Sequence, residues 1–149
     1  MTTAQLFIER MKEYRLNADR CAVDVIGVGG GVVDYIVKSG YNIIGFNSGE
    51  SVREQVSFLS FKNKRAKAYW DLRTGLQEGT FTLGQNEDLR KELLNIRYSV
   101  TDKMIQIESK AEIKKRLGFS PDLADATVMC MSAMKGKTDI PILSFDFPI

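Results

Sequence analysis

Hydrophobic and polar positions divide the first third of the chain into short helical and extended segments. Apolar residues at helical spacing predict an amphipathic helix over residues 3–16. An apolar strand over 21–26 runs into a glycine-rich turn, a helix follows over 30–39, and a second strand covers 41–46. A strand, helix and strand so close together favour two parallel strands joined by a right-handed crossover.

The remainder of the chain also divides into short helical and extended segments. Strict alternation on both sides of Asp102-Lys103 predicts a hairpin. A capping box, Ser109-x-x-Glu112, opens a short basic helix, and Ser120-Pro121 opens an apolar one. The predicted elements are a polar loop over 47–55, a helix over 60–78, a strand over 80–83, a helix from 86 or 87 to 94, hairpin strands over 97–101 and 104–108, a helix ending at Gly118, a helix ending at Met134, and one strand in the tail 139–149.

Length and composition are typical of one soluble globular domain. The 149 residues contain no repeat and no linker, so residues 1–149 are expected to form a single unit. No apolar run reaches the roughly 18 residues of a membrane span. The N-terminus lacks the apolar core of a signal peptide, so residence in the cytoplasm is expected.

The residue inventory narrows the chemistry that the chain could perform. It contains no histidine, which excludes Ser-His-Asp and Cys-His catalysis and histidine-based metal sites. Cys21 and Cys130 do not form a CxxC pattern, so a zinc knuckle or a disulfide framework is not expected. Any reaction must therefore use carboxylates, lysines, tyrosines or water.

Asp24 interrupts an otherwise apolar strand just before the glycine run 27–31. A buried carboxylate without a partner is costly, so such a residue usually binds a cation or a metal, or else caps the turn that follows. The glycine run also raises the alternative of a dinucleotide-binding loop. Against it, Val32 stands at the third glycine position, and the second strand ends in Phe46-Asn47 with no acid.

Asp122 and Asp125 lie at i and i+3 at the start of the last predicted helix. Acids in a first turn complement the helix dipole, which is the simpler interpretation. The rest of this helix is apolar nearly all round, however, and such a helix is buried. Together with Asp24, these carboxylates offer hard oxygen ligands that suit Mg²⁺ or Mn²⁺, and two such ions can hydrolyse phosphodiesters.

Basic residues cluster close to these acids in sequence, although the net charge is only +2. Such clusters could position a phosphate backbone, whereas the simpler interpretation is a solvated surface. The expected DNA-binding residues are Lys64, Arg65, Lys110, Lys114, Lys115 and Arg116.

At this level of detail the chain resembles the nuclease domain of phage terminase large subunits. Three stretches carry the resemblance and together span most of the chain. They are VDVIGVGGGVVD over 23–34, FKNKRAKAYW over 61–70, and IQIESKAEIKKRLGFSPDLADA over 105–126.

The resemblance implies a ribonuclease-H-like (resolvase-like) α/β fold with a mixed sheet and flanking helices. It implies a Mg²⁺- or Mn²⁺-dependent endonuclease with a two-metal site that cuts concatemeric viral double-stranded DNA during packaging, with the portal and the small terminase subunit as partners. Asp24 matches the second acid of that family, and the last acid falls at Asp122 or Asp125.

The family's first strands, which carry its first acid, and its packaging ATPase have no counterpart in this sequence. The resemblance therefore implies an excised piece or a decayed prophage gene with reduced metal binding. We also expect an open strand edge beside Asp24 to favour self-association or docking of the tail. The alternatives are a Rossmann-like nucleotide-binding domain and a non-catalytic module that binds DNA or packaging proteins.

Overall fold

The computed structural model describes residues 1–27 and 29–134. The chain forms a mixed α/β structure with a two-stranded and a four-stranded sheet in this described part. The helices are α1 (Thr3–Glu13), a 3-10 turn η1 (Ala18–Arg20), α2 (Gly29–Lys38), α3 (Lys64–Glu78), α4 (Glu87–Asn95), α5 (Lys110–Leu117) and α6 (Asp122–Met134). The strands are β1 (Ala22–Asp24), β2 (Ile44–Phe46), β3 (Gln55–Val56), β4 (Leu59–Phe61), β5 (Tyr98–Thr101) and β6 (Met104–Ile107).

The predicted strand–helix–strand unit is present as β1, α2 and β2. The two strands are parallel, with Ala22 opposite Ile44 and Asp24 opposite Phe46. Both are shorter than the apolar runs that predicted them. Helix α1 packs against α2 around Met11 and Ile36, which are both buried. Within the described residues, β1 has a strand partner on one edge only, as expected from the resemblance.

The predicted helix over 60–78 begins too early. Residues Leu59–Phe61 form β4, which pairs with β3 in antiparallel and with β6 in parallel orientation. Phe61 is buried beside Ile105 of β6, and this long-range contact outweighs the local helical pattern. The helix starts after Asn63, whose side chain accepts a hydrogen bond from the backbone N–H of Ala66.

The strand predicted over 80–83 is wrong. This segment has no strand structure, and the Phe81 ring packs against Gly75 of α3 so closely that a Cβ there would lie 2.0 Å from it. The apolar residues of the segment are therefore used for packing on a helix. Phe81 and Leu83 contact the core cluster that contains Tyr69 and Leu72.

The second half of the chain otherwise follows the prediction. Strands β5 and β6 form the antiparallel hairpin, with Asp102 and Lys103 at its turn in left-handed conformations. The capping box of Ser109 and Glu112 opens α5. Because β6 pairs with β4 in parallel and with β5 in antiparallel orientation, the four-stranded sheet is mixed.

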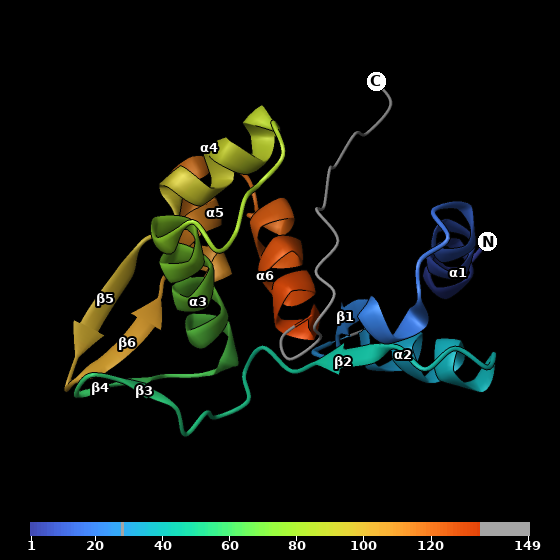
Figure 1. Ribbon diagram of the computed structural model, residues 1–149, viewed down its shortest axis with the longest axis horizontal. Coiled ribbons are helices and arrows are strands. Elements are labelled where there is room, and N and C mark those ends of the chain that lie inside the picture. Colours follow the sequence, from blue (N-terminus) through green and yellow to red (C-terminus); the bar gives the residue numbers. More distant parts are fainter. Residues whose placement is uncertain (28, 135–149) are drawn as a thin grey trace.

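Helix α6 is the central element, and it joins the part of the structure around the two-stranded sheet to the part around the four-stranded sheet. It contacts α3 and α4 on one side and η1, β1 and β2 on the other (Figure 1). Ala124 and Val128 are almost fully buried, as expected for a helix that is apolar nearly all round. Among the described residues, no helix combines the length and apolar composition that crossing a membrane requires. The strand predicted in the tail lies outside the described residues.

Candidate metal site

Asp24 is the last residue of β1, where the strand meets the glycine turn. Its Oδ1 accepts a hydrogen bond from the backbone N–H of Ile26 at 3.1 Å, and its Oδ2 accepts one from the Ser48 hydroxyl at 3.3 Å. Asp24 therefore caps the turn, as the simpler interpretation predicted. Each oxygen accepts one such bond, which leaves further acceptor capacity on both.

The glycine run is explained by packing against the end of β1. A Cβ on Gly29 would lie 1.6 Å from the carbonyl oxygen of Asp24, so only glycine allows the start of α2 to approach the strand this closely. Gly27 has a φ of +72°, the left-handed region that favours glycine. These two constraints account for the turn without a dinucleotide.

Asp125 lies in the first turn of α6 and is 6% exposed. Its Oδ1 accepts hydrogen bonds from the Tyr69 hydroxyl at 2.7 Å and from Arg65 Nε at 3.0 Å. Its Oδ2 is buried and accepts no hydrogen bond within the described structure. The Nζ of Lys110 lies 2.9 Å from this second oxygen as an ion-pair partner, without hydrogen-bond geometry.

Asp24 and Asp125 line the same small cavity, from opposite sides of the contact between β1 and α6. The cavity has a volume of about 10 Å³, close to the space that one water molecule or one small ion needs. Its other lining residues are Phe46, Ser48, Arg65, Lys110, Val128 and Met129.

Asp122 does not join these two acids. It is exposed at the start of α6 and does not line the cavity. Residues at i and i+3 are rotated by about 60° from each other around a helix, and the boundary of the buried face passes between them. The structure therefore brings Asp24 and Asp125, but not Asp122, to this cavity. Among the described residues, no group of three His, Cys, Asp or Glu side chains could hold a metal ion.

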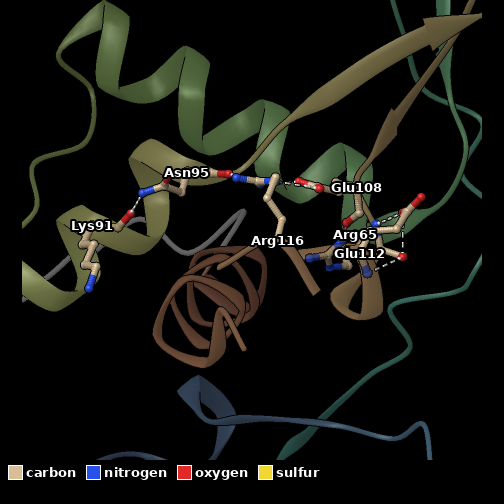
Figure 2. A network of polar contacts seen from close by, with 7 residues as sticks. Arg65, Lys91, Asn95, Glu108, Glu112 and Arg116 are labelled. Atoms are coloured by element: carbon tan, nitrogen blue, oxygen red, sulfur yellow. Dashed lines mark hydrogen bonds and ion pairs between the residues drawn. The ribbon is translucent and has the colours of Figure 1, made fainter. Parts of the chain in front are cut away.

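Arg65 was expected to contact DNA, but it is engaged inside the protein. Its side chain is 12% exposed and is held at both ends, by Asp125 through Nε and by the backbone carbonyl of Glu108 through Nη1. Its remaining nitrogen, Nη2, is buried without a partner in the described structure. Figure 2 shows the polar network that continues from Glu108, the residue after β6, to Arg116 of α5 and Asn95 of α4.

The other predicted DNA-binding cations divide into two groups. Arg116 binds the Glu108 carboxylate and the carbonyl of Asn95, and Lys64 pairs with Glu50 at 3.1 Å. Lys110 faces Asp125, while Lys114 and Lys115 are exposed on α5.

Two residues important to the geometry had no sequence signal. Tyr69 follows several basic residues in the sequence and matches no site motif, yet its hydroxyl donates a hydrogen bond to Asp125. Burial is the main cause that raises its pKa, followed by the Asp125 carboxylate, so the hydroxyl stays protonated and donates. Glu92 of α4 is 8% exposed and accepts a hydrogen bond from the backbone N–H of Ala124 at 2.8 Å. It therefore caps α6 from another element, which no local pattern could indicate.

The two carboxylates at the cavity could hold one small, hard cation only if water or other ligands completed its coordination. Asp125 Oδ2 is a buried acceptor that receives no hydrogen bond, and Asp24 and the Ser48 hydroxyl add oxygen atoms beside the same cavity. Oxygen ligands of this kind suit Mg²⁺ and Mn²⁺. A cation at Oδ2 would have to displace the Lys110 ammonium, because like charges repel at that distance. The cavity volume leaves no room for a second ion without a local rearrangement.

Comparisons with known proteins point to one kind of domain. No family profile matches the chain, and no curated protein matches it in sequence. Among solved structures, the nuclease domain of the large terminase subunit gp2 of bacterial virus Sf6 matches with a TM-score of 0.64 and 25% identity, covering 86% of this chain and 70% of that one. A single-substitution variant of that domain with manganese matches with the same TM-score and identity and 71% of its length covered. A variant with calcium gives a TM-score of 0.64, 25% identity and 70% of its length covered.

The chain therefore has the ribonuclease-H-like fold, with a mixed sheet and flanking helices. By this fold, the chain is classed as a nuclease module. More particularly, the structural matches identify it as a nuclease domain of the bacteriophage terminase large-subunit type.

Proposed function

We propose that the chain cleaves double-stranded DNA by metal-dependent phosphodiester hydrolysis, as the nuclease module of a packaging terminase. The observation that carries the proposal is the cavity shared by Asp24 and Asp125, in which one buried carboxylate oxygen receives no hydrogen bond. Two acids from separate elements, β1 and α6, meet there beside exposed lysines. The likeness to a terminase nuclease domain with manganese supports the same site chemistry.

The metal would be Mg²⁺ or Mn²⁺, held by Asp24 and Asp125. When bound in pairs, such ions activate water and stabilise the leaving oxygen of a phosphodiester. A second ion would need Lys110 to move and further oxygen ligands from water, from the DNA phosphate or from an acid beyond these two. Asp24 and Asp125 would supply the carboxylate oxygens that such ions prefer.

Lys110, Lys114 and Lys115 would orient the DNA. Lys110 lies beside Asp125, and the other two continue along the exposed surface of α5. Displaced from Asp125 by a cation, the Lys110 ammonium would be free to pair with a phosphate oxygen. Arg65 has a different role in this proposal, because its side chain is only 12% exposed and donates to Asp125 inside the protein.

The wider setting follows from the proposed role in packaging. The chain, acting as one unit over residues 1–149, would work in the host-cell cytoplasm with the portal and the small terminase subunit as partners. The edge of β1 that has no strand partner among the described residues supports pairing with a second copy or another segment.

A plasmid-nicking assay in MnCl₂ tests the proposal. Asp24→Asn and Asp125→Asn should each abolish nicking, because each removes a charged ligand while keeping the shape of the side chain. Asp122→Asn is the matched control, since it makes the same change one turn away at an exposed position. Nicking that survives the first two substitutions would overturn the assigned site. If the unsubstituted chain binds DNA in a mobility-shift assay but never nicks it, the non-catalytic module becomes the better description.

A further inference from the structure

The two oxygens of the Asp125 carboxylate have different surroundings. A carboxylate oxygen has about two acceptor positions. On Oδ1 both are used, by the Tyr69 hydroxyl at 2.7 Å and by Arg65 Nε at 3.0 Å. Oδ2 receives no hydrogen bond and has only the Lys110 ammonium beside it, at 2.9 Å, and Asp125 lines the cavity that Asp24 shares.

Both donors on Oδ1 are themselves fixed. Tyr69 is buried in the core cluster that β2, α3, α4 and α6 form, and its hydroxyl donates to Oδ1 from there. Arg65 is anchored at its other end by the carbonyl of Glu108 and lies over the Tyr69 ring at 5.0 Å. Neither donor can leave Oδ1 without losing a buried hydrogen bond, so Asp125 presents a single oxygen to the cavity.

Carboxylates that can offer one oxygen or two discriminate between cations. Ca²⁺ takes six to eight oxygen ligands in flexible geometry and often accepts both oxygens of one carboxylate. Mg²⁺ requires six ligands in near-octahedral geometry and uses one oxygen from each carboxylate. A carboxylate restricted to one oxygen therefore favours a small six-coordinate cation over Ca²⁺.

We propose that Tyr69 is a specificity-determining residue: by occupying Oδ1, its hydroxyl restricts Asp125 to one-oxygen coordination and makes the site prefer Mg²⁺ or Mn²⁺ over Ca²⁺. Tyr69 acts through Asp125 and does not itself touch the cation. This inference rests on the proposed metal site and adds to it the reason for the choice of cation.

Isothermal titration calorimetry with MnCl₂ and with CaCl₂ tests this on the full chain. The substitution is Tyr69→Phe, which removes only the hydroxyl and frees one acceptor position on Oδ1. We expect the ratio of the Ca²⁺ to the Mn²⁺ dissociation constant to fall by about tenfold, within the range seen when a residue that orients a metal ligand is lost. The control is Tyr98→Phe, which makes the same change on a half-exposed tyrosine of β5 that does not line the cavity.

The possible outcomes distinguish a failure of this inference from a failure of the proposed function on which it rests. A merely structural role for Tyr69 would lower the thermal unfolding temperature and leave the ratio unchanged in the folded chain, and that result would overturn the inference while the metal site stands. An unchanged or increased preference for Mn²⁺ would overturn it equally. If the unsubstituted chain binds neither cation, both the proposed metal site and the inference fail.

Discussion

Lys110 Nζ lies 2.9 Å from Asp125 Oδ2, so a side chain of the protein itself forms an ion pair with the carboxylate oxygen that receives no hydrogen bond. The lysine comes from α5 and is half exposed, whereas the aspartate comes from α6 and is buried. A divalent cation and this ammonium group compete for one oxygen. The occupancy of the site by metal therefore depends on how easily Lys110 leaves.

Removing that ammonium group should strengthen metal binding. We expect Lys110→Ala to raise the affinity for Mn²⁺ by roughly fivefold, since an ion pair with one exposed partner contributes at most about 1 kcal/mol. Calorimetric titration measures the change, and Lys114→Ala on the same helix is the control, because that lysine is exposed and does not line the cavity. Weaker binding by the Lys110 variant would mean that the lysine supports the site instead of competing for it.

The two acids of α6 should differ sharply in their contribution to stability. Asp125→Ala leaves the Arg65 guanidinium and the Tyr69 hydroxyl buried without their acceptor, which should cost about 3 kcal/mol of unfolding free energy. Asp122→Ala removes only a favourable charge at an exposed helix start, worth about 0.5 kcal/mol. Urea unfolding of the two variants measures the contrast, and similar losses would contradict the described burial of Asp125.

The glycine turn offers a matched pair of substitutions two residues apart. Gly29→Ala places a methyl group 1.6 Å from the Asp24 carbonyl oxygen, so it should cost about 3 kcal/mol and weaken Mn²⁺ binding by moving Asp24. Gly31→Ala meets no atom within 4 Å and lies in the same helix, where alanine should add about 0.5 kcal/mol of stability. Thermal unfolding distinguishes the two, and a harmless Gly29→Ala would show that α2 does not abut β1.

Glu92 gives a prediction about pH. Burial is the main cause that raises the pKa of Glu92, while hydrogen bonds from Ala124 and Leu123 oppose the shift. The folded chain then holds the proton more tightly than the unfolded chain, so this group favours the folded state most at low pH and loses that contribution as pH rises through the raised pKa.

Glu92→Gln keeps an acceptor oxygen for the Ala124 N–H and cannot ionise. We therefore expect the unfolding free energy of the unsubstituted chain, relative to this variant, to decrease as pH rises from about 4 towards neutrality. Chemical unfolding of both chains across that range measures the difference. A difference that grows with pH, or stays constant, would show that the pKa of Glu92 is not raised. The comparison cancels Glu108 and Glu112, whose lowered pKa values change stability in the opposite direction in both chains.

Local signals predicted most of the elements correctly where neighbouring residues decide the structure. The capping box of Ser109 and Glu112 and the hairpin turn at Asp102-Lys103 lie within a few residues of what they control, and both are confirmed. The errors fall where distant contacts decide. Phe61 extends a helical pattern in sequence but joins a strand because it pairs beside Ile105, and the Phe81 segment packs on Gly75 instead of forming a strand.

By itself, the sequence determined the α/β class, the parallel strand–helix–strand unit and the restriction of chemistry to oxygen and nitrogen groups other than histidine, because these depend on periodicity, spacing and residue type. Only the tertiary structure decided which acids meet. Spacing along α6 treats Asp122 and Asp125 alike, but packing against α3 buries one beside Tyr69 and Arg65 and leaves the other in water. The sequence suggested Arg65 as a DNA contact. The same packing makes it the ion-pair partner of Asp125, because a charge that is taken out of water requires an opposite charge close by.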